Sequence, residues 1–461
     1  MRATDIVRAV TERQTSARDV AEQALARIAA ARDLNAVVTI DPERTRAAAG
    51  AVDARVAAGE WLPLAGVPVV VKDNVWAEGW RITQGSRLFA DFTAPEDSTA
   101  IARLRRAGAV IVGIGATSEF ACKGVTTSLL YGPTRHPQDP QLTPGGSSGG
   151  PATAVAAGLV PLAIGTDAGG SSRRPPAHVG VVGFKPSYGA IPYGPGFAEP
   201  FWRLSVIAPI AADVGDARLA FEAMAGADPR DPDSFDVCSA VEGKPLRVAF
   251  SPRLGLDVAV DDDVSAGLRQ TINRLCAGGM SIVDKDPIWP AGLAEDAVMP
   301  LQHAGLAALH GDAFRSDPTQ FDPDIAKQIE RGLGLSGADV AGALEASTRI
   351  ARAFAAVVTD VDVLLTPTVP CGAWPFTQLG PVEIGGQPAS PRAHAVFTPF
   401  ANHAGVPAIS IPCGKNADGL PFGLQLIAAR GRDRMLVDAA AQAERLLSFS
   451  PARTSSPTSP A

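Results

Sequence analysis

The sequence has little charge and few metal-binding patterns. Charged residues make up 19% of the 461 positions, and only six histidines and five cysteines are present. The cysteines are scattered, and neither a CxxC nor an HExxH pattern occurs, so we expect reduced thiols and no metal site. No apolar run reaches the about 18 residues of a transmembrane helix. The first residues, MRATDIVRAV, lack the apolar core of a secretory signal. We therefore expect a cytoplasmic protein without a cofactor.

Basic runs and phosphate-binding patterns are also missing. The net charge is −7, and no cluster of lysine and arginine predicts a nucleic acid or an anionic membrane as a partner. The pattern GxxxxGK[ST] is absent, and no GxGxxG opens a helix after a strand. With 46% hydrophobic residues the chain can bury a large core. These absences favour an enzyme that acts on a small molecule.

Three short motifs carry the chemistry. They are the apolar run VPVVVK at Val67 to Lys72, the cluster GGSSGG at Gly145 to Gly150, and the cluster GTDAGGSS at Gly165 to Ser172. A serine hydroxyl is a weak nucleophile that needs a neighbouring base and hydrogen-bond donors for the oxyanion. Serines, glycines and one lysine supply these parts. The combination predicts a serine hydrolase that uses no histidine.

The second glycine-serine cluster follows a stretch that we expect to be a buried strand. Glycine tolerates positive φ, so a turn through Gly169 and Gly170 lets consecutive N–H groups point into one space. The amides of Ala168, Gly169, Gly170 and Ser171 are therefore candidate oxyanion donors, with Ser171 as the candidate nucleophile. An ordinary turn or a phosphate cradle is the alternative interpretation.

The first cluster satisfies the nucleophile-elbow pattern GxSxG through Gly145, Ser147 and Gly149. That motif requires a strand that leads directly into the serine. Here the preceding residues are RHPQDPQLTP, and three prolines in ten residues exclude a central strand. We therefore interpret the elbow match as accidental.

Taken together, these motifs resemble the amidase signature family, whose machinery is a Ser-Ser-Lys triad. The resemblance runs from Leu64 to about Gly194 and resumes at FTPFANHAGVPAISIP and GLPFGLQLIA. It implies that Lys72 is the base, that Ser147 is a bridging serine preceded by a cis peptide, and that Ser171 is the nucleophile. The family spacing of 24 residues between the two serines selects Ser147 over Ser148.

The resemblance also implies an architecture. We expect an α/β fold in which a mixed central sheet is covered by helices on both faces. One domain is expected over residues 1–449, followed by a disordered tail at 450–461 that is rich in serine and proline. Its parts are a signature core at about 64–194, a variable helical section at about 255–357, and a return to the sheet at about 358–430.

A basic role for Lys72 requires an unusual environment. Free lysine has a pKa of about 10.4, and lowering it to about 7 disfavours the cation by roughly 4 to 5 kcal/mol. Burial beside Val69 to Val71 could supply part of this shift. The alternative is a surface lysine that ends a strand, and Asp73 could then simply pair with a cation.

Two departures from the family pattern concern the substrate. The family commonly continues with SIRIPA or SIRQPA after the nucleophile, whereas this chain has SSRRPP at 171–176. Arg174 is an added charge near the expected acyl pocket, and we expect it either to pair with a distant carboxylate or to bind an anionic group of the substrate. His178 replaces a bulky apolar residue. Arg174, His178 and Ser148 are the candidate substrate-binding residues.

The expected function is an amidase that hydrolyses a small carboxamide, carboxylate-bearing or urea-like, to a carboxylate and ammonia. The resemblance also allows the amidase subunit of a tRNA-dependent amidotransferase, although that subunit usually has glutamine where Arg174 stands. A Ser-His-Asp hydrolase and a binding protein without activity are further alternatives, and the resemblance suggests a homodimer. The histidines that could serve as a base are His178, His303, His310, His394 and His403.

The hydrophobic pattern predicts alternating strands and helices. A capping box at Ser16 to Asp19 begins a helix whose buried face includes Val20, Ala24, Leu25 and Ile28. Another helix is expected at Ser98 to Ala107, and residues 255–357 are expected to be mostly helical. The predicted strands are Val67 to Val71, Val110 to Gly113, Leu159 to Ile164, Leu246 to Phe250, Asp360 to Leu365, Ala408 to Pro412 and Gly423 to Ile427.

Overall fold

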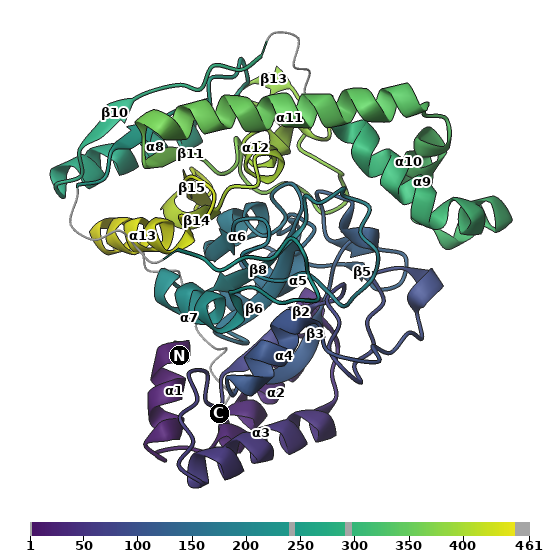
Figure 1. Ribbon diagram of the computed structural model, residues 1–461, viewed down its shortest axis with the longest axis vertical. Coiled ribbons are helices and arrows are strands. Elements are labelled where there is room, and N and C mark those ends of the chain that lie inside the picture. The colour runs from purple at the N-terminus through teal and green to yellow at the C-terminus, as the bar shows by residue number, and fades with distance from the viewer. Residues whose placement is uncertain (1, 239–244, 291–296, 448–461) are drawn as a thin grey trace.

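The computed structural model describes residues 2–238, 245–290 and 297–447. An eleven-stranded mixed sheet runs through the molecule (Figure 1). In spatial order its strands are β1 (Val37–Thr39), β3 (Val110–Gly115), β2 (Pro68–Lys72), β6 (Leu162–Asp167), β8 (Val206–Ala211), β7 (Val182–Lys185), β14 (Ala408–Lys415), β15 (Pro421–Ile427), β11 (Val363–Pro367), β9 (Val248–Phe250) and β10 (Ile282–Asp284). The predicted tail at 450–461 lies outside the described residues.

The sheet combines a parallel group at each side of an antiparallel centre. β2 pairs in parallel with both β3 and β6, and β9 pairs in parallel with β10 and β11. From β6 through β8, β7, β14, β15 to β11, each neighbour is antiparallel. β2, β3 and β6 are buried at every residue, which is typical of strands covered on both faces.

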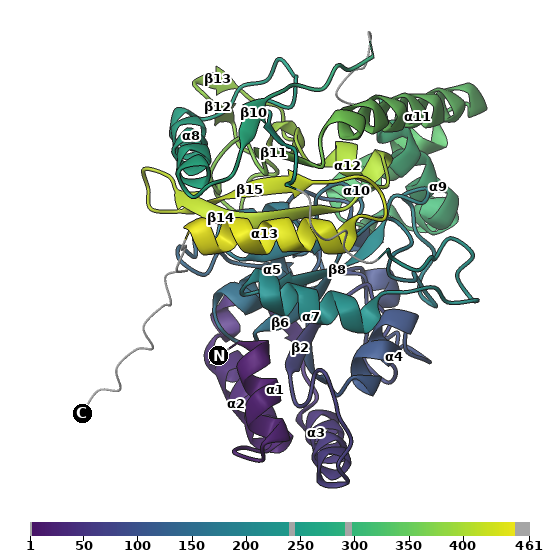
Figure 2. The same cartoon turned by 60° about the vertical axis from the view of Figure 1, so that its left-hand side comes forward.

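Helices cover both faces of this sheet, as predicted. Successive residues of a strand point to opposite faces. In β15, Phe422 lies against Gly267 of α8 (Asp262–Ala277), whereas the next residue, Gly423, faces Ala177 of α6 (Arg174–Val179). α5 (Gly149–Ala156) packs with α6, and α13 (Asp433–Leu447) packs with α7 (Val214–Met224) and α8. Figure 2 shows α13 lying alongside β14.

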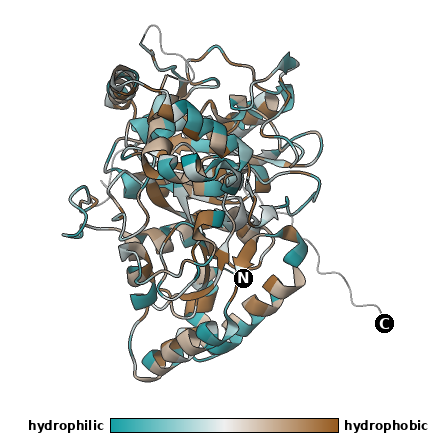
Figure 3. Ribbon diagram, turned by 90° about the vertical axis from the view of Figure 1, so that its right-hand side faces the viewer, coloured by the Kyte–Doolittle hydropathy of each residue, from teal (hydrophilic) through white to brown (hydrophobic). Residues whose placement is uncertain are grey.

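The amino-terminal part forms helices around the β3 side of the sheet. They are α1 (Ala3–Thr11), α2 (Ala17–Ala30), α3 (Pro42–Ala57) and α4 (Thr99–Arg106). The predicted capping box of α2 is present, because the Ser16 hydroxyl accepts a hydrogen bond from the Asp19 amide at 2.9 Å. The predicted face of α2 is buried. Figure 3 shows hydrophobic colouring concentrated in the central strands and hydrophilic stretches on outer helices.

A helical section lies at one end of the molecule (Figure 1). It consists of α9 (Met299–Ser316), α10 (Pro323–Leu333) and α11 (Gly337–Asp360), and α11 packs against α12 (Pro399–His403). Two small hairpins pair β4 (Thr127–Ser128) with β5 (Gly132–Pro133) and β12 (Glu383–Ile384) with β13 (Gln387–Pro388). Short 3-10 helices occupy Arg32–Leu34, Arg87–Phe89, Glu119–Ala121, Pro318–Gln320 and Ala393–Ala395. No helix within the described ranges is both long and apolar enough to cross a membrane.

Several predicted boundaries need correction. The strand predicted from Leu159 begins at Leu162, because the chain is still turning after α5, and it extends to Asp167. The strand predicted from Asp360 begins at Val363, because Asp360 is the last residue of α11. The strands β7 and β8 were not predicted. Their short apolar segments carry no periodicity that separates a buried strand from other buried structure.

Candidate active site

The base candidate lies where two parallel strands end. Val71 in β2 pairs with Ile164 in β6, so Lys72 and Thr166 reach the same edge of the sheet. Lys72 is fully buried. Its Nζ lies 2.8 Å from the Ser147 hydroxyl oxygen and 2.9 Å from the Thr166 hydroxyl oxygen. The strand register therefore brings together a lysine and a serine that are 75 residues apart in the chain.

Ser147 is carried by the loop that precedes α5. The peptide bond between Gly146 and Ser147 is cis, as the family resemblance implied. A Cβ on Gly146 would lie 2.7 Å from backbone atoms of Val125, so only glycine fits this close approach. The Thr126 hydroxyl donates to the Gly145 carbonyl at 2.9 Å and accepts from the Gly149 amide at 2.9 Å. These contacts fix the serine beside the end of β2.

Burial determines the protonation of Lys72. Loss of hydration in the core lowers the pKa of the Lys72 amine to about 7, and the carboxylates of Glu199 and Asp167 oppose this effect. The neighbouring Asp73 does not pair with the amine. Its carboxylate accepts hydrogen bonds from the Thr83 amide at 2.7 Å, from the Thr83 hydroxyl, and from the Gly85 amide at 3.1 Å. The interpretation of Lys72 as an exposed, simply paired cation is wrong.

The nucleophile candidate follows β6 directly. Ala168, Gly169 and Ser171 line a cavity of about 570 Å³. Gly170 has a φ of +115°, whereas Gly169 is not in the positive-φ region. The Gly170 amide donates to the Asp167 carboxylate at 2.7 Å and is therefore not free to bind an oxyanion. This contact removes Gly170 from the predicted donors and leaves the amides of Ala168, Gly169 and Ser171.

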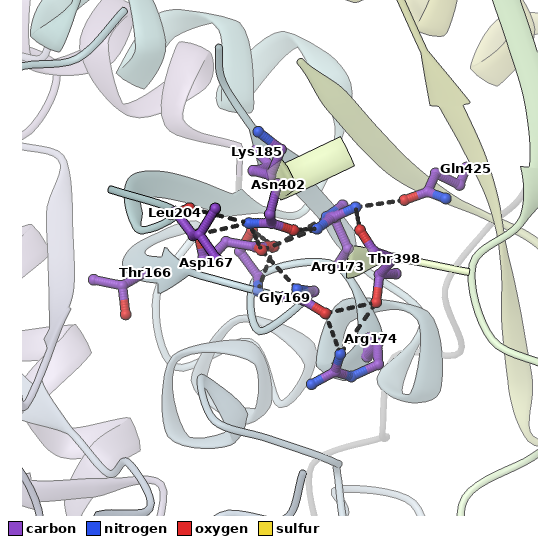
Figure 4. A network of polar contacts seen from close by, with 12 residues as sticks. Thr166, Asp167, Gly169, Arg173, Arg174, Lys185, Leu204, Thr398, Asn402 and Gln425 are labelled. Carbon is purple, nitrogen blue, oxygen red and sulfur yellow. Dashed lines mark hydrogen bonds and ion pairs between the residues drawn. The ribbon is translucent and has the colours of Figure 1, made fainter. Parts of the chain in front are cut away.

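A buried ion pair holds this loop (Figure 4). Arg173 binds Asp167 with two nitrogens, Nε to Oδ2 at 3.0 Å and Nη2 to Oδ1 at 2.9 Å, and both side chains are fully buried. Asn402 donates to the same carboxylate at 2.9 Å. Burial raises the pKa of Asp167, but the Arg173 guanidinium and the Asn402 amide outweigh it and hold the pKa well below the usual carboxyl range. Asp167 is thus a fixed anion that anchors both ends of the turn.

Arg174 links the two serine loops rather than pairing with a carboxylate. Its guanidinium donates to the Gly169 carbonyl and to the Thr398 hydroxyl, the latter at 3.1 Å (Figure 4). It also donates to the Gly146 carbonyl at 3.4 Å. The residue is buried yet lines the cavity. Burial lowers the pKa of Arg174 to about 9, so the side chain still carries its charge at neutral pH. All three acceptors are neutral, so these contacts place no opposing charge beside it.

The other two substrate-binding candidates lie behind the cavity. Ser148 is fully buried and donates to the Thr166 carbonyl at 3.1 Å. His178 is also fully buried, its ring packs edge-on against Trp374 with centroids 5.4 Å apart, and burial lowers its pKa to about 3. Neither residue lines the cavity. Their positions fit packing under the serine loops.

The cavity has walls from both halves of the molecule. Cys122, Ser171 and Arg174 come from the signature core, while Gln302 of α9 and Lys327 of α10 come from the helical section. Its volume lies within the range of about 300 to 1,000 Å³ that small-molecule sites occupy. The arrangement can therefore present an amide carbonyl to Ser171 while helices contact the rest of a small substrate.

Three histidines line the cavity, and among the described residues none of them hydrogen-bonds Ser171. His303, His394 and His403 line it. Burial lowers the pKa of His303 and of His403 to about 4 and holds the pKa of His394 well below its usual value. His403 Nδ1 lies 2.8 Å from the hydroxyl oxygen of Ser347 on α11, and not from Ser171. This geometry gives a Ser-His-Asp arrangement no support at Ser171.

Sequence reasoning missed the residues that support the loops. Thr166 contacts Lys72 and Asn74, and Thr398 and Asn402 contact the turn after β6 from a distant segment. Thr166 stands inside the GTDAGGSS motif, and the other two stand inside FTPFANHAGVPAISIP. The motifs therefore contained the signal, but only the fold shows which of their side chains meet.

Comparisons with known proteins show the family of the chain. The family model described as Amidase matches residues 19–437. A glutamyl-tRNA(Gln) amidotransferase subunit from Deinococcus deserti is 38% identical, covering 96% of this chain and 96% of that protein. The protein of the same description from Synechococcus sp. WH7803 is 36% identical over 94% of each chain. The chain belongs to the amidase signature family and is an amidohydrolase.

Solved structures show the same fold. A bacterial aryl acylamidase of the amidase signature family superposes with a TM-score of 0.90 at 28% identity, covering 97% of this chain and 96% of that one. A chain from an inhibitor-bound vestigial complex, described as revealing the evolutionary origins of an s-triazine catabolic enzyme, gives a TM-score of 0.86 at 32% identity, with 96% and 98% coverage. The predicted amidase signature fold is confirmed.

Proposed function

We propose that Ser171, Ser147 and Lys72 form the catalytic relay of an amidase that converts a small carboxamide to a carboxylate and ammonia through an acyl-enzyme. One observation carries this proposal: a fully buried lysine contacts a serine at 2.8 Å beside a glycine turn that opens on a cavity. In this proposal the lysine is the base, one serine is the nucleophile, the other serine relays the proton, and the amides of the turn bind the oxyanion.

The pKa of Lys72 supports its function as a base. With a pKa of about 7, a large fraction of the amine is neutral at physiological pH and can accept a proton. An ordinary lysine would be almost fully protonated. The Thr166 hydroxyl, 2.9 Å from Nζ, orients the amine toward Ser147.

The proposed reaction proceeds in two halves. Ser147 takes the hydroxyl proton of Ser171 and passes its own proton to Lys72, while the Ser171 oxygen attacks the amide carbon. The amides of Ala168, Gly169 and Ser171 are the proposed donors to the developing oxyanion. The proton returns through Ser147 to the departing nitrogen, the C–N bond breaks and ammonia leaves. Water then attacks the ester by the same relay and releases the carboxylate.

The charge of the cavity supports a polar or anionic substrate. Arg174 lines the cavity and is held by three neutral oxygens. A substrate carboxylate, or a strongly polar group such as that of a urea, would be favoured near this guanidinium. We therefore keep a carboxylate-bearing or urea-like amide as the proposed substrate class.

The relatives named above favour a second candidate function, in which the same amide hydrolysis takes place in a subunit of an amidotransferase. Both relatives named above belong to a glutamyl-tRNA(Gln) amidotransferase, and they match almost the whole of this chain. In that setting the ammonia would pass to a partner-bound acceptor, and glutamine would be the amide donor. Arg174, which stands where such relatives usually have glutamine, is the feature that favours a stand-alone amidase.

Ammonia release distinguishes the two settings. The purified chain should be tested on glutamine, dicarboxylic acid monoamides, neutral carboxamides and ureas, with Ser171→Ala as the blank. A stand-alone amidase should hydrolyse a preferred amide other than glutamine without any partner. Hydrolysis of glutamine above all others would favour the amidotransferase setting, and release from no amide would contradict the proposal.

A further inference from the structure

A second cavity opens beside the first. Its volume is about 300 Å³, and it shares five lining residues with the larger cavity. The shared residues are Val298, Arg392, Ala395, Pro399 and His403. These residues form a common wall, so the smaller space, which we call the branch, adjoins the cavity that Ser171 lines.

The walls of the branch are mainly apolar. Leu256, Val258, Ile350, Val396 and Phe400 line it together with the shared residues. Val396 and Phe400 are half-buried and Ile350 is buried, so aliphatic and aromatic surface faces the space. The main cavity differs, because Lys123, Arg174, Lys327 and Arg331 bring charge to its walls.

His403, one of the two polar residues at the junction, is uncharged at neutral pH. Burial lowers the pKa of His403 to about 4, and its Nδ1 is engaged with the Ser347 hydroxyl at 2.8 Å. Asp257 and Arg392 also line the branch. Arg392 is exposed and lines both cavities.

The aromatic wall of the branch is supported from behind. The Phe400 ring packs against Trp289, with centroids 4.3 Å apart at 33°. The Trp289 indole donates to the Leu254 carbonyl at 2.7 Å, which fixes its orientation. A hydrophobic wall with such support provides a preformed surface for an apolar group.

The branch adjoins the catalytic loop through one short helix. The α12 region supplies Thr398 and Asn402 to the turn after β6, and Pro399, Phe400 and His403 to the branch. A group bound in the branch would therefore lie across α12 from the loop that carries Ser171.

We propose that this branch is a subsite for an apolar alkyl or aryl substituent of the amide substrate. The proposal rests on the proposed amidase function and refines its substrate class: the preferred amide combines a polar group in the charged cavity with a hydrophobic group in the branch. Each methylene that leaves water for the branch should contribute about fourfold in kcat/KM, equivalent to about 0.8 kcal/mol.

The kinetic test compares amides of increasing size. Two series should be assayed, one with longer or aromatic acyl groups from acetamide to hexanamide and benzamide, and one with N-alkyl and N-aryl acetamides. Wild-type kcat/KM should rise about fourfold per added methylene in one of the two series until the branch is full. The series that responds identifies the side of the amide that enters the branch.

Blocking variants connect this trend to the branch. Ile350→Trp and Val396→Phe add bulk from α11 and from the segment before α12, and each should abolish the preference for the longer amide over acetamide. Leu344→Trp is the matched control, because Leu344 lies on the same helix, is exposed and lines neither cavity. Its preference should equal that of the wild type. Thermal unfolding will show whether Ile350→Trp folds. If it does not fold, Val396→Phe provides the test of the branch.

A binding measurement separates this inference from the proposed function. Calorimetric titration with acetate, hexanoate and benzoate should show tighter binding of the apolar acids and a more negative heat-capacity change. This readout needs no turnover. If no amide is hydrolysed but hexanoate binds tighter than acetate and Ile350→Trp removes the difference, the proposed function fails and the subsite stands. Equal affinity for all three acids, with no dependence of kcat/KM on size, would overturn the subsite.

Discussion

The signature core and the helical section differ in how they hold charge. On the core side, Asp167 and Arg173 are fully buried and bind each other with two hydrogen bonds. On the helical side, α9 carries the ion pair Arg315 to Asp312 with side chains 60% and 103% exposed. Buried charges require complete pairing, whereas exposed charges are solvated by water. The buried pair therefore fixes the turn after β6, whereas the exposed pair on α9 constrains the fold little.

The sequence of α10 shows the same division within one helix. Ile325 and Ile329 are buried, while Asp324, Lys327 and Arg331 line the cavity. The apolar stripe attaches the helix, and Asp324, one of the lining residues, pairs with Lys123 at 3.5 Å. Substitutions at buried ion pairs and at exposed ones should therefore have effects of very different size.

The largest effect is expected at the nucleophile. Ser171→Ala removes the hydroxyl that attacks the amide, so acyl-enzyme formation should cease while the fold persists, since the side chain loses a single oxygen. A fluorophosphonate probe followed by peptide mass spectrometry should label Ser171 in the wild type. Label on Ser147 or Ser148 would contradict the assignment and restore the nucleophile-elbow interpretation.

The next largest effect is expected at the base. Lys72→Ala should reduce kcat by several orders of magnitude, because the relay loses its proton acceptor. Wild-type activity should rise with pH through an apparent pKa of about 7, since only the neutral amine accepts a proton and burial lowers its pKa to that value. Single replacements of His178, His394 and His403 serve as controls and should each change kcat by less than about 100-fold. A histidine variant as inactive as Lys72→Ala would contradict the Ser-Ser-Lys mechanism.

The free energy of unfolding should distinguish the buried ion pair from the exposed one. Asp167→Asn leaves the Arg173 guanidinium buried without its counter-charge, which should destabilise the protein by about 3 to 5 kcal/mol in chemical denaturation. Because the pKa of Asp167 is lowered in the folded state, the stability it contributes is present above the ordinary carboxyl pKa and is lost as pH falls. The control Asp312→Asn, at the exposed pair of α9, should unfold at the same midpoint as the wild type. Equal midpoints for both variants would remove the distinction between the two ion pairs.

The smallest effect concerns the recognition of substrate charge. Arg174→Gln should lower kcat/KM for a dicarboxylic acid monoamide about ten- to a hundredfold more than for its neutral methyl ester, since a charge-assisted hydrogen bond contributes roughly 1.5 to 3 kcal/mol. Arg315→Gln, a change of the same kind at an exposed position, should leave the ratio unaltered. Equal losses on both amides would mean that Arg174 only holds Gly169 and Gly146 in place.

Much of the fold could be predicted from periodicity and motifs. The strands β2, β3, β14 and β15 and the capping box of α2 lie close to where the pattern placed them, because runs of β-branched residues favour strands and a capping box marks a helix start. The Lys72 contact with Ser147 and the cis bond at Gly146 follow the family resemblance. The catalytic roles of these residues stay predictions.

The oxyanion donors and the residues that line the substrate cavity could not be predicted in the same way. From the sequence, all four amides after β6 were equally good candidates for oxyanion donors. The structure excludes the Gly170 amide as a donor, because it donates to the Asp167 carboxylate instead. Ser148 and His178 stand beside motif residues, yet they point into the core. Proximity in sequence does not fix the direction of a side chain once the backbone turns through glycine.

The family, the alternation of strands and helices, and the lysine and two serines were all accessible without coordinates, because each depends on local pattern or on motif spacing. Four properties required the folded chain: the pKa of Lys72, the pairing of Asp167 with Arg173 and Asn402, the three neutral partners of Arg174, and the apolar branch behind α12. These properties depend on burial and on contacts between segments as far as 235 residues apart. Hydration and charge are set by the surroundings of a group in three dimensions, and no local pattern specifies those surroundings.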